Sequence, residues 1–249
     1  MQYKYAREQL DYSDFSSGRV FYSLPGHPAF PVRLASEIFQ RCLAHRERIY
    51  GSATPCILYD PCCGAAYHLS VLAYLHREHI LKLIASDIDE KAIGLAGRNL
   101  GLLQPDGLDK RIRELSEMLE NYGKDSHREA LRSAAVLKEK LSTKPRLETR
   151  VFQASATDRT AISKRIPPKS VDILFTDVPY GRHSRWHDSE HNEFSNPLWS
   201  MLDALFDVLS PSSIVALASD KGQKAAHERF QRVEHFQIGK RRIVFLRPM

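Results

Sequence analysis

The sequence predicts an α/β protein in which helices cover both faces of a doubly wound, mostly parallel sheet of seven strands. Short apolar runs alternate with segments whose apolar residues recur at helical spacing, which is typical of parallel strands joined by crossover helices. The first two runs each end in an acid, at Asp60 and Asp87. The last two are separated only by a tight turn at Gly239, which predicts an antiparallel hairpin at one edge of the sheet.

The chain opens with an irregular, Pro- and Gly-rich stretch that leads into a helix. Pro31 suits the first turn of a helix. Beyond it Leu34, Ile38 and Cys42 repeat at helical spacing, which predicts an amphipathic helix over 31–48. We therefore expect an N-terminal extension and helix over 1–50.

The next elements follow the strand–helix alternation. Strands are expected at 56–60 and 80–87, with a helix over 67–78 between them. Asp89 is placed to cap the helix that follows the second strand.

A charged insertion over 104–148 interrupts the alternation. It carries two helical patterns and nearly equal numbers of acids and bases, which favours a pair of solvated helices; an arm that contacts RNA is the alternative. The remaining elements are strands at 149–155, 170–177 and 212–220, a capped helix at 196–209, and the hairpin runs 232–238 and 241–247. Because we find no repeat, low-complexity tract or linker, we expect a single domain over 1–249.

Composition limits the partners and the compartment. The net charge of +6 and the pI near 9.1 favour polyanionic partners and say nothing about the fold. No run approaches the ~18 apolar residues that span a bilayer, and the N-terminus lacks the apolar core of a signal peptide. The 4 cysteines form no CxxC pair, so we expect a reduced, cytoplasmic protein.

The stretch DPCCGAA (60–66) follows the first strand, where doubly wound sheets bind ligands. A metal or redox site is disfavoured, because the adjacent side chains of Cys62 and Cys63 usually point apart and no CxxC or His pair completes a ligand set. A cofactor loop fits better, since Gly64 allows close backbone approach and the next helix offers free N–H groups. The absence of GxGxxG disfavours NAD. Asp87 is placed to accept hydrogen bonds from ribose hydroxyls.

The most specific motif is FTDVPYG (175–181). An apolar strand delivers Asp177 to the carboxyl edge of the sheet. The Asp177 carboxylate and a backbone carbonyl beside Pro179 can accept hydrogen bonds from an exocyclic amine, and Tyr180 can stack on the base that carries the amine. An ordinary strand end with a core tyrosine is the plainer interpretation, and the cofactor loop argues against it.

Together these motifs resemble the class I S-adenosylmethionine-dependent methyltransferases that act on amino groups of bases. Val178 stands where the [N/D]-P-P-[Y/F] motif has its first proline, which resembles the D-x-P-[Y/F]-G form of RNA guanine methyltransferases. In order and spacing, PGHPAFPVRLASEIFQR, DPCCGAAY, HREHILKLIASDIDE and TDVPYG are similar to the AviRa-like 23S rRNA guanine methyltransferases, an avilamycin (orthosomycin) resistance family, over roughly 3–247.

The resemblance implies a Rossmann-like methyltransferase sheet, S-adenosyl-L-methionine as cofactor, and one guanine of 23S rRNA, naked or in the large ribosomal subunit, as substrate. Methylation there would protect the ribosome from an orthosomycin. It also implies a monomer that needs no metal and no membrane. The cofactor site would be formed by Asp60, Pro61, Cys62, Cys63, Gly64, Ala66, Asp87, Ile88, Ser155 and Ala156, and the catalytic site by Asp177, Pro179 and Tyr180.

Two positions depart from the family pattern. The loop normally reads D-P-C-C-G-[S/A]-G, so Ala66 replaces a glycine near the methionine end of the cofactor and is tolerable only if its φ stays negative. Ser155 replaces the acid or amide often found beside the adenine. Both changes leave cofactor binding possible, with a weakened site as the alternative. A non-catalytic RNA-binding or assembly protein therefore stays open, as does a methyltransferase of small molecules or of glutamine side chains.

Positioning dominates the expected mechanism. Methyl transfer from a sulfonium needs near-attack geometry and no metal. Because a guanine amine is a poor nucleophile, Asp177 and the carbonyl beside Pro179 are expected to orient it and to stabilise the developing positive charge. The target base must be unstacked to enter the site.

RNA contacts are expected from two basic segments. They are the loop after the motif, with Arg182, Arg185 and Trp186, and the terminal hairpin, with Lys240, Arg241 and Arg242. Solvated charges on a turn are the plainer interpretation of the hairpin. The loop also holds His183, His187 and His191, but the Gly, Ser and Asp around them favour a loop over a metal site.

Overall fold

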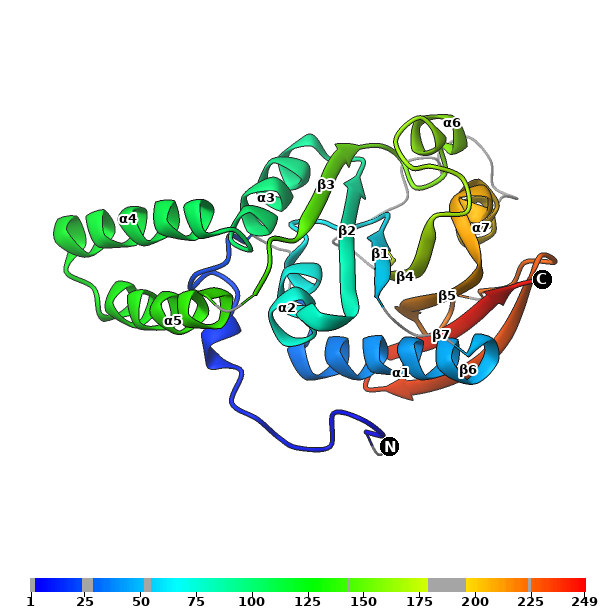
Figure 1. Ribbon diagram of the computed structural model, residues 1–249, viewed down its shortest axis with the longest axis horizontal. Helices are drawn as coiled ribbons and strands as arrows, with labels where there is room; N and C mark the ends of the chain where they lie inside the picture. Colours follow the sequence, from blue (N-terminus) through cyan, green and yellow to red (C-terminus); the bar gives the residue numbers. More distant parts are fainter. Residues whose placement is uncertain (1–2, 24–28, 52–54, 143, 179–195, 224) are drawn as a thin grey trace.

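The computed structural model describes residues 3–23, 29–51, 55–142, 144–178, 196–223 and 225–249, and these contain a sheet of seven strands (Figure 1). The strand order is β3-β2-β1-β4-β5-β7-β6. The strands are β1 (Cys56–Asp60), β2 (Ile80–Asp87), β3 (Glu148–Gln153), β4 (Val171–Asp177), β5 (Leu209–Asp220), β6 (Phe230–Ile238) and β7 (Arg241–Pro248). The predicted fold class is confirmed.

The strand order reverses at β1, which pairs in parallel with both β2 and β4. β3 extends the sheet beyond β2, and β5 extends it beyond β4, again in parallel. Successive side chains face opposite cores: Leu58 packs in one buried cluster and Tyr59 in the other. The crevice outside the carboxyl ends at such a reversal is where doubly wound sheets bind ligands.

The final hairpin is antiparallel as predicted, and its second strand is the inner one. β7 lies between β5 and β6 and runs antiparallel to both. Its first residue, Arg241, pairs with Asp220 at the end of β5. The hairpin turn therefore lies at the carboxyl edge of the parallel strands.

Helices cover both faces of the sheet (Figure 1). One face is covered by α1 (Val32–Tyr50), α2 (Tyr67–Leu75) and α3 (Glu90–Gly101), and the other by α6 (Arg159–Ser163) and α7 (Pro197–Leu205). Asp89 caps α3 as predicted, because its side chain accepts hydrogen bonds from the Lys91 and Ala92 amides. Among the residues that the structure describes, none of the helices combines the length and apolar character needed to cross a bilayer.

Some boundaries differ from the sequence prediction. The helix expected over 67–78 ends at Leu75 and is followed by the 3₁₀ turn η2 (Arg77–His79). The helix expected over 196–209 divides into α7 and the 3₁₀ turn η4 (Phe206–Val208). The short helix α6 has no counterpart in the prediction. β5 begins at Leu209, the last residue of the expected helix, and all seven expected strands are present.

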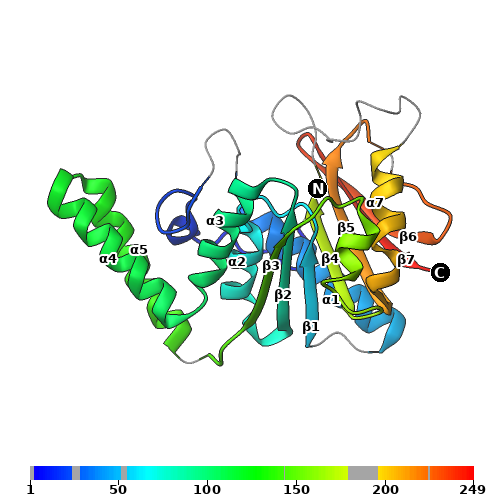
Figure 2. The same ribbon diagram turned by 90° about the horizontal axis from the view of Figure 1, so that it is seen from above.

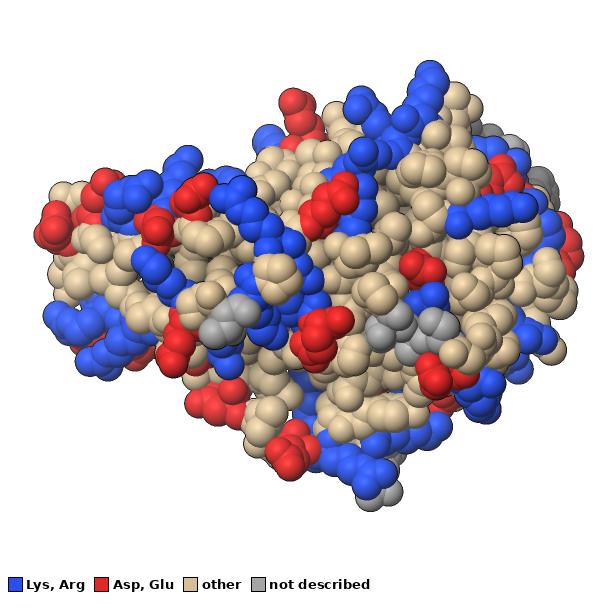
Figure 3. All heavy atoms as spheres, viewed as in Figure 1, with Lys and Arg blue, Asp and Glu red and all other residues tan. Residues whose placement is uncertain are grey.

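The insertion forms a helical pair, α4 (Pro105–Tyr122) and α5 (Asp125–Ser142), which projects beyond the β3 end of the sheet (Figures 1 and 2). An N-terminal segment, residues 3–23 with the 3₁₀ turn η1 (Ser13–Phe15), packs against its base. There Arg111 Nε donates to the Val20 carbonyl at 2.9 Å. Acidic and basic side chains are interspersed on the visible face of the pair (Figure 3).

Candidate active site

The loop after β1 is folded by backbone hydrogen bonds to the end of β2. The Cys63 amide donates to the Ser86 carbonyl at 3.0 Å, and the Gly64 amide donates to Asp87 Oδ2 at 2.8 Å. Gly64 has a φ of +52°, where glycine is favoured, and a side chain there would meet no atom within 4 Å. The loop and Asp87, assigned to one site from the sequence, are therefore in direct contact.

Asp87 holds this edge together through both of its oxygens. Its Oδ1 accepts a hydrogen bond from the Asp89 amide at 3.0 Å, while Oδ2 is bound by Gly64. Burial raises the pKa of Asp87, and the two backbone hydrogen bonds oppose that rise. Since a carboxylate has about four acceptor sites, Asp87 can still accept bonds from a ligand.

The loops after β2 and β3 meet beside Asp87. The Ala154 amide donates to the Asp87 carbonyl at 3.0 Å, and Gln153 Nε2 donates to the Ile88 carbonyl at 2.8 Å. Ile88 is 40% exposed. Ser155 turns its hydroxyl toward Thr157 Oγ1 at 2.8 Å, and Ala156 is buried. An apolar surface next to an acid is thus present at the carboxyl edge.

The two adjacent cysteines, Cys62 and Cys63, are held as protonated thiols. Burial raises the pKa of both Cys62 and Cys63 well above the ordinary value, and the charges of Asp60 and Asp87 add to the rise. A protonated thiol is a poor nucleophile and a poor metal ligand. Within the described residues, no group of His, Cys, Asp and Glu is arranged to hold a metal ion.

Ala66 differs from the sequence expectation. Its φ is +52° and its ψ is 31°, in the left-handed region, so the expected negative φ is wrong. Ala66 closes the turn, since its amide donates to the Cys63 carbonyl at 2.7 Å, and it is the N-cap residue of α2. The methyl group is 0% exposed and packs in the core, so it offers no surface to a ligand.

Asn99 on α3 supports the loop from behind, and the sequence analysis missed it. It is fully buried, and its Nδ2 donates to the Tyr22 carbonyl at 2.9 Å and to the Ala65 carbonyl at 2.8 Å. Its Oδ1 accepts a bond from the Tyr22 amide at 2.8 Å. The sequence did contain a signal for a buried Asn99, because it is a polar residue next to Leu100, which belongs to the apolar stripe of the helix.

Asp177 ends β4 and faces the start of β7. About a quarter of its side chain is exposed (25%), and its Oδ2 lies 3.8 Å from Arg241 Nη2. The Arg241 guanidinium also lies 5.1 Å from the ring centre of Phe30. Arg241, assigned to RNA from the sequence, is thus a neighbour of Asp177, whereas Lys240 is exposed at the turn and Arg242 is partly buried.

Several predicted residues lie outside the described residues. They are Pro179 and Tyr180 of the motif and the loop residues Arg182, Arg185, Trp186, His183, His187 and His191.

Asp60 lies behind Asp177, in contact with a histidine that the sequence analysis did not single out. Its side chain is fully buried; Oδ1 accepts a bond from the Cys62 amide at 3.0 Å, and Oδ2 lies 3.2 Å from His68 Nε2. His68, on α2, is 6% exposed. It precedes Leu72 by one helical turn, which was the signal that it lies on the buried face.

The pKa values of these groups are displaced by burial. Burial raises the pKa of Asp60 to about 7 and lowers that of His68 to about 4. Burial also raises the pKa of Asp177 to about 6, against the opposing charge of Arg241. Strongly displaced pKa values that gather at the carboxyl edge make these groups candidates for a functional site.

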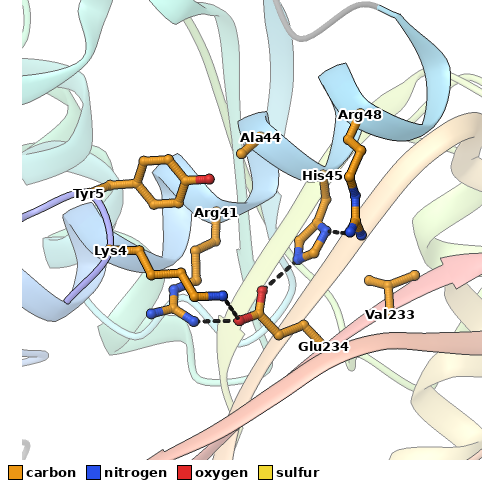
Figure 4. Close-up of a pocket in the computed structure, with 8 residues that line it drawn as sticks. All are labelled: Lys4, Tyr5, Arg41, Ala44, His45, Arg48, Val233 and Glu234. Atoms are coloured by element: carbon orange, nitrogen blue, oxygen red, sulfur yellow. Dashed lines mark hydrogen bonds and ion pairs between the residues drawn. The ribbon is translucent and has the colours of Figure 1, made fainter. Parts of the chain in front are cut away.

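A separate hollow of about 320 Å³ lies between α1, β6 and the N-terminal segment (Figure 4). At its centre Glu234 accepts hydrogen bonds from Lys4 at 2.7 Å, Arg41 at 2.5 Å and His45 at 2.7 Å. No predicted site residue lines it. Because Lys4 and Arg41 are already paired with Glu234, we interpret it as a brace for the N-terminal segment.

The chain is similar over its length to known rRNA methyltransferases. Residues 1–241 match the family described as rRNA methyltransferase AviRa. A curated relative from Streptomyces viridochromogenes, the 23S rRNA (guanine(2535)-N(1))-methyltransferase, is 39% identical over 246 residues, which are 98% of this chain and 95% of the relative.

Solved structures agree. The rRNA methyltransferase aviRa from Streptomyces viridochromogenes superposes with a TM-score of 0.86 at 37% identity, covering 99% of this chain and 96% of that one. TrmN from Thermus thermophilus has a TM-score of 0.52 at 16% identity, covering 90% of this chain and 50% of that one. The second likeness concerns the fold alone.

Proposed function

The chain belongs to the AviRa family of rRNA methyltransferases, and from that premise we propose that it transfers a methyl group from S-adenosyl-L-methionine to N1 of a guanine in 23S rRNA. The observation that carries the proposal is the 39% identity to a guanine-N1 methyltransferase over nearly the whole of both chains. Asp177, at the carboxyl edge beside the DPCCGAA loop, supports it.

The residues at this edge fit S-adenosyl-L-methionine. The space around Gly64 leaves its backbone accessible, and the first turn of α2 offers N–H groups to the methionine carboxylate. Asp87 has acceptor capacity for ribose hydroxyls, and exposed Ile88 offers an apolar face to the adenine. When bound, the cofactor supplies an electrophilic methyl group whose bond to sulfur breaks as the bond to N1 forms.

The choice of N1 changes the task of Asp177. The sequence analysis expects Asp177 to accept a hydrogen bond from an exocyclic amine and so to orient it. Neutral guanine carries a proton on N1, and this proton must leave when the methyl group arrives. Asp177 is partly exposed and its pKa is raised to about 6 by burial, so at neutral pH it is ionised and able to accept that proton.

The remaining assignments complete the proposal. The whole chain acts as one methyltransferase domain and as a monomer in the cytoplasm, where ribosomes are. Pro179 and Tyr180 hold the unstacked base, and RNA phosphates are bound by Arg182 and Arg185 with Trp186 and by the hairpin cations Lys240 and Arg242. Methylation of the ribosome confers resistance to an orthosomycin antibiotic.

The direct test is methyl transfer to ribosomal RNA. Purified protein is incubated with unmodified 23S rRNA, or with large subunits, and methyl-tritiated S-adenosylmethionine, and the labelled nucleotide is mapped by mass spectrometry. We expect 1-methylguanosine at one position. Cofactor binding without label on either substrate would favour the non-catalytic alternative, and a different modified base would overturn the choice of N1.

A further inference from the structure

Two buried groups behind Asp177 have no role in the reaction described so far. They are the carboxyl of Asp60, at the end of β1, and the imidazole of His68, on α2. Asp60 Oδ2 and His68 Nε2 lie 3.2 Å apart, and both residues are more than nine-tenths buried. The two atoms are close but not aligned for a hydrogen bond, and neither has a hydrogen bond to any other described residue. Thr176 is the other side chain that acts on the Asp60 carboxyl as a hydrogen-bonding group.

The surroundings of His68 restrict what its ring can bind. The ring centres of Phe175 and Phe30 lie 4.8 Å and 5.7 Å from it, so much of the ring contacts aromatic carbon. The Phe175 backbone takes a hydrogen bond from the imidazole. An imidazole that donates through Nδ1 presents the lone pair of Nε2 to Asp60. Two acceptor atoms at this distance repel each other unless a proton lies between them.

The charge of Asp60 matters because Asp177 is close. Among the described residues, four polar groups interact electrostatically with Asp177: Asp60 from β1, His68 from α2, Arg241 from β7 and Cys62 from the loop. A second negative charge at Asp60 would raise the pKa of Asp177 and so oppose its ionisation. A proton held at Asp60 removes that repulsion.

We propose that His68 is a positioning residue that holds one proton jointly with Asp60, so that Asp60 stays uncharged and Asp177 alone is ionised. Protonated Asp60 donates to His68 Nε2. The proton that N1 loses goes to Asp177 and from there to solvent, while the proton of the pair stays in place. The link to methyl transfer rests on the proposed function; the shared proton does not.

The directions of the pKa shifts agree with this arrangement. Burial raises the pKa of Asp60 to about 7 and lowers that of His68 to about 4, so between these values the proton of the pair resides on Asp60. On this proposal the two groups titrate as a pair, because they share one proton.

The first test needs no activity. From about pH 4.5 to 6.5 an unfolded chain has its proton on histidine, whereas the folded pair has it on Asp60, so the two linkage effects cancel. Asp60→Asn leaves only the histidine effect, and stability relative to wild type should rise with pH across this window. His68→Leu leaves only the carboxyl effect, and relative stability should fall. The free energy of unfolding of each variant is measured by urea denaturation at several pH values. If it changed with pH in parallel with that of the wild type, the shared proton would be overturned.

The second test is the acid limb of the pH profile of kcat. Without His68 the neutral carboxyl of Asp60 loses its imidazole acceptor, so its pKa falls part of the way from the value that burial gives it, and Asp60 carries charge at the pH where Asp177 titrates. His68→Leu should lower kcat about tenfold and move the limb up by about half a pH unit, with KM nearly unchanged. Adding Asp60→Asn to His68→Leu should return the limb toward its wild-type position.

Controls separate this effect from a general loosening of the fold. His68→Gln keeps an amide oxygen that can accept from Asp60, and it should restore the wild-type limb and most of kcat. A folded His68→Leu variant with an unmoved limb, or a shift that persists in the double variant, would overturn the positioning role. Inactive wild-type protein with the opposed stability slopes would overturn the proposed function alone.

Discussion

The two halves of the carboxyl edge differ in how their buried polar groups are paired. In the cofactor half, Gly64, Asp87 and Asn99 are joined by hydrogen bonds within the chain. In the catalytic half, several buried side-chain atoms have no hydrogen bond to a described residue: Asp60 Oδ2, His68 Nε2, Thr176 Oγ1, Asp177 Oδ1 and Arg241 Nε. This difference in pairing indicates that the first half is built for binding and the second for proton transfer.

A buried polar atom without a hydrogen bond destabilises a protein by about 1–3 kcal/mol, so a cluster of them needs a reason. Binding a cofactor requires a loop of fixed shape, which bonds within the chain provide. Proton transfer instead requires groups that are free to exchange partners with the substrate. On this interpretation, replacements in the cofactor half act mainly on stability and affinity, and those in the catalytic half act on rate.

The largest effect is expected in the catalytic half, from Asp177→Asn. The amide has the same shape but cannot take the N1 proton, so the rate of methyl transfer should fall by about 10²–10⁴-fold. The dissociation constant for S-adenosylmethionine, measured by calorimetry, should stay within about threefold, since Asp177 is separate from the loop. A variant that loses cofactor binding as much as rate would break the comparison.

The cofactor half should respond in the opposite way to Asn99→Ala. The replacement leaves the Tyr22 backbone and the Ala65 carbonyl without their partner, so stability in urea should fall by about 3 kcal/mol. S-adenosylmethionine should bind more weakly, and the rate at saturating cofactor should change little. Gln153→Ala is the control, because it removes one exposed link between loops and should lower stability by less than about 1 kcal/mol.

Replacement of Arg241 tests whether this hairpin residue binds RNA or stabilises the ionised form of Asp177. Burial raises the pKa of Asp177 to about 6 and Arg241 opposes that rise, so methyl transfer should decline as pH falls through about 6 and Asp177 gains a proton. Arg241→Gln should move this limb upward and lower kcat about tenfold at pH 6.5.

Arg242→Gln is the matched control, since the neighbouring side chain points to the other face of β7. It should raise KM for RNA, lessen the salt dependence of binding and leave the pH limb in place. If both variants changed only KM, Arg241 would be an RNA contact and not a partner of Asp177.

The sequence predicted what depends on local pattern. The seven strands, the cap at Asp89 and the DPCCGAA loop against Asp87 follow from periodicity and from acids at strand ends. The contact of Arg241 with Asp177 could not be predicted this way, because it joins residues more than sixty positions apart and depends on the pairing of β7 with β5. For Asn99 the helical pattern indicates a buried polar residue but not its partners, which are Tyr22 in the distant N-terminal segment and Ala65 in the loop.

Ala66 shows the same limit at a single residue and offers the smallest expected effect. Periodicity says nothing of φ, and Ala66 takes the left-handed conformation where the loop that binds Asp87 through Gly64 passes into α2. This conformation costs a residue with a Cβ about 1–2 kcal/mol. Ala66→Gly should therefore raise the free energy of unfolding by about 1 kcal/mol, less the burial of one methyl group.

Gly64→Ala is the converse control. Its φ is also +52°, and open space surrounds it, so any loss of stability there reports the backbone alone. We expect a loss of about 1 kcal/mol in urea unfolding. If Ala66→Gly instead lowered stability, the buried methyl group would outweigh the strain. Gain at Ala66 with loss at Gly64 would mean that the well-paired cofactor half holds a strained residue in place, through the bonds of Asn99 and Asp87 around it.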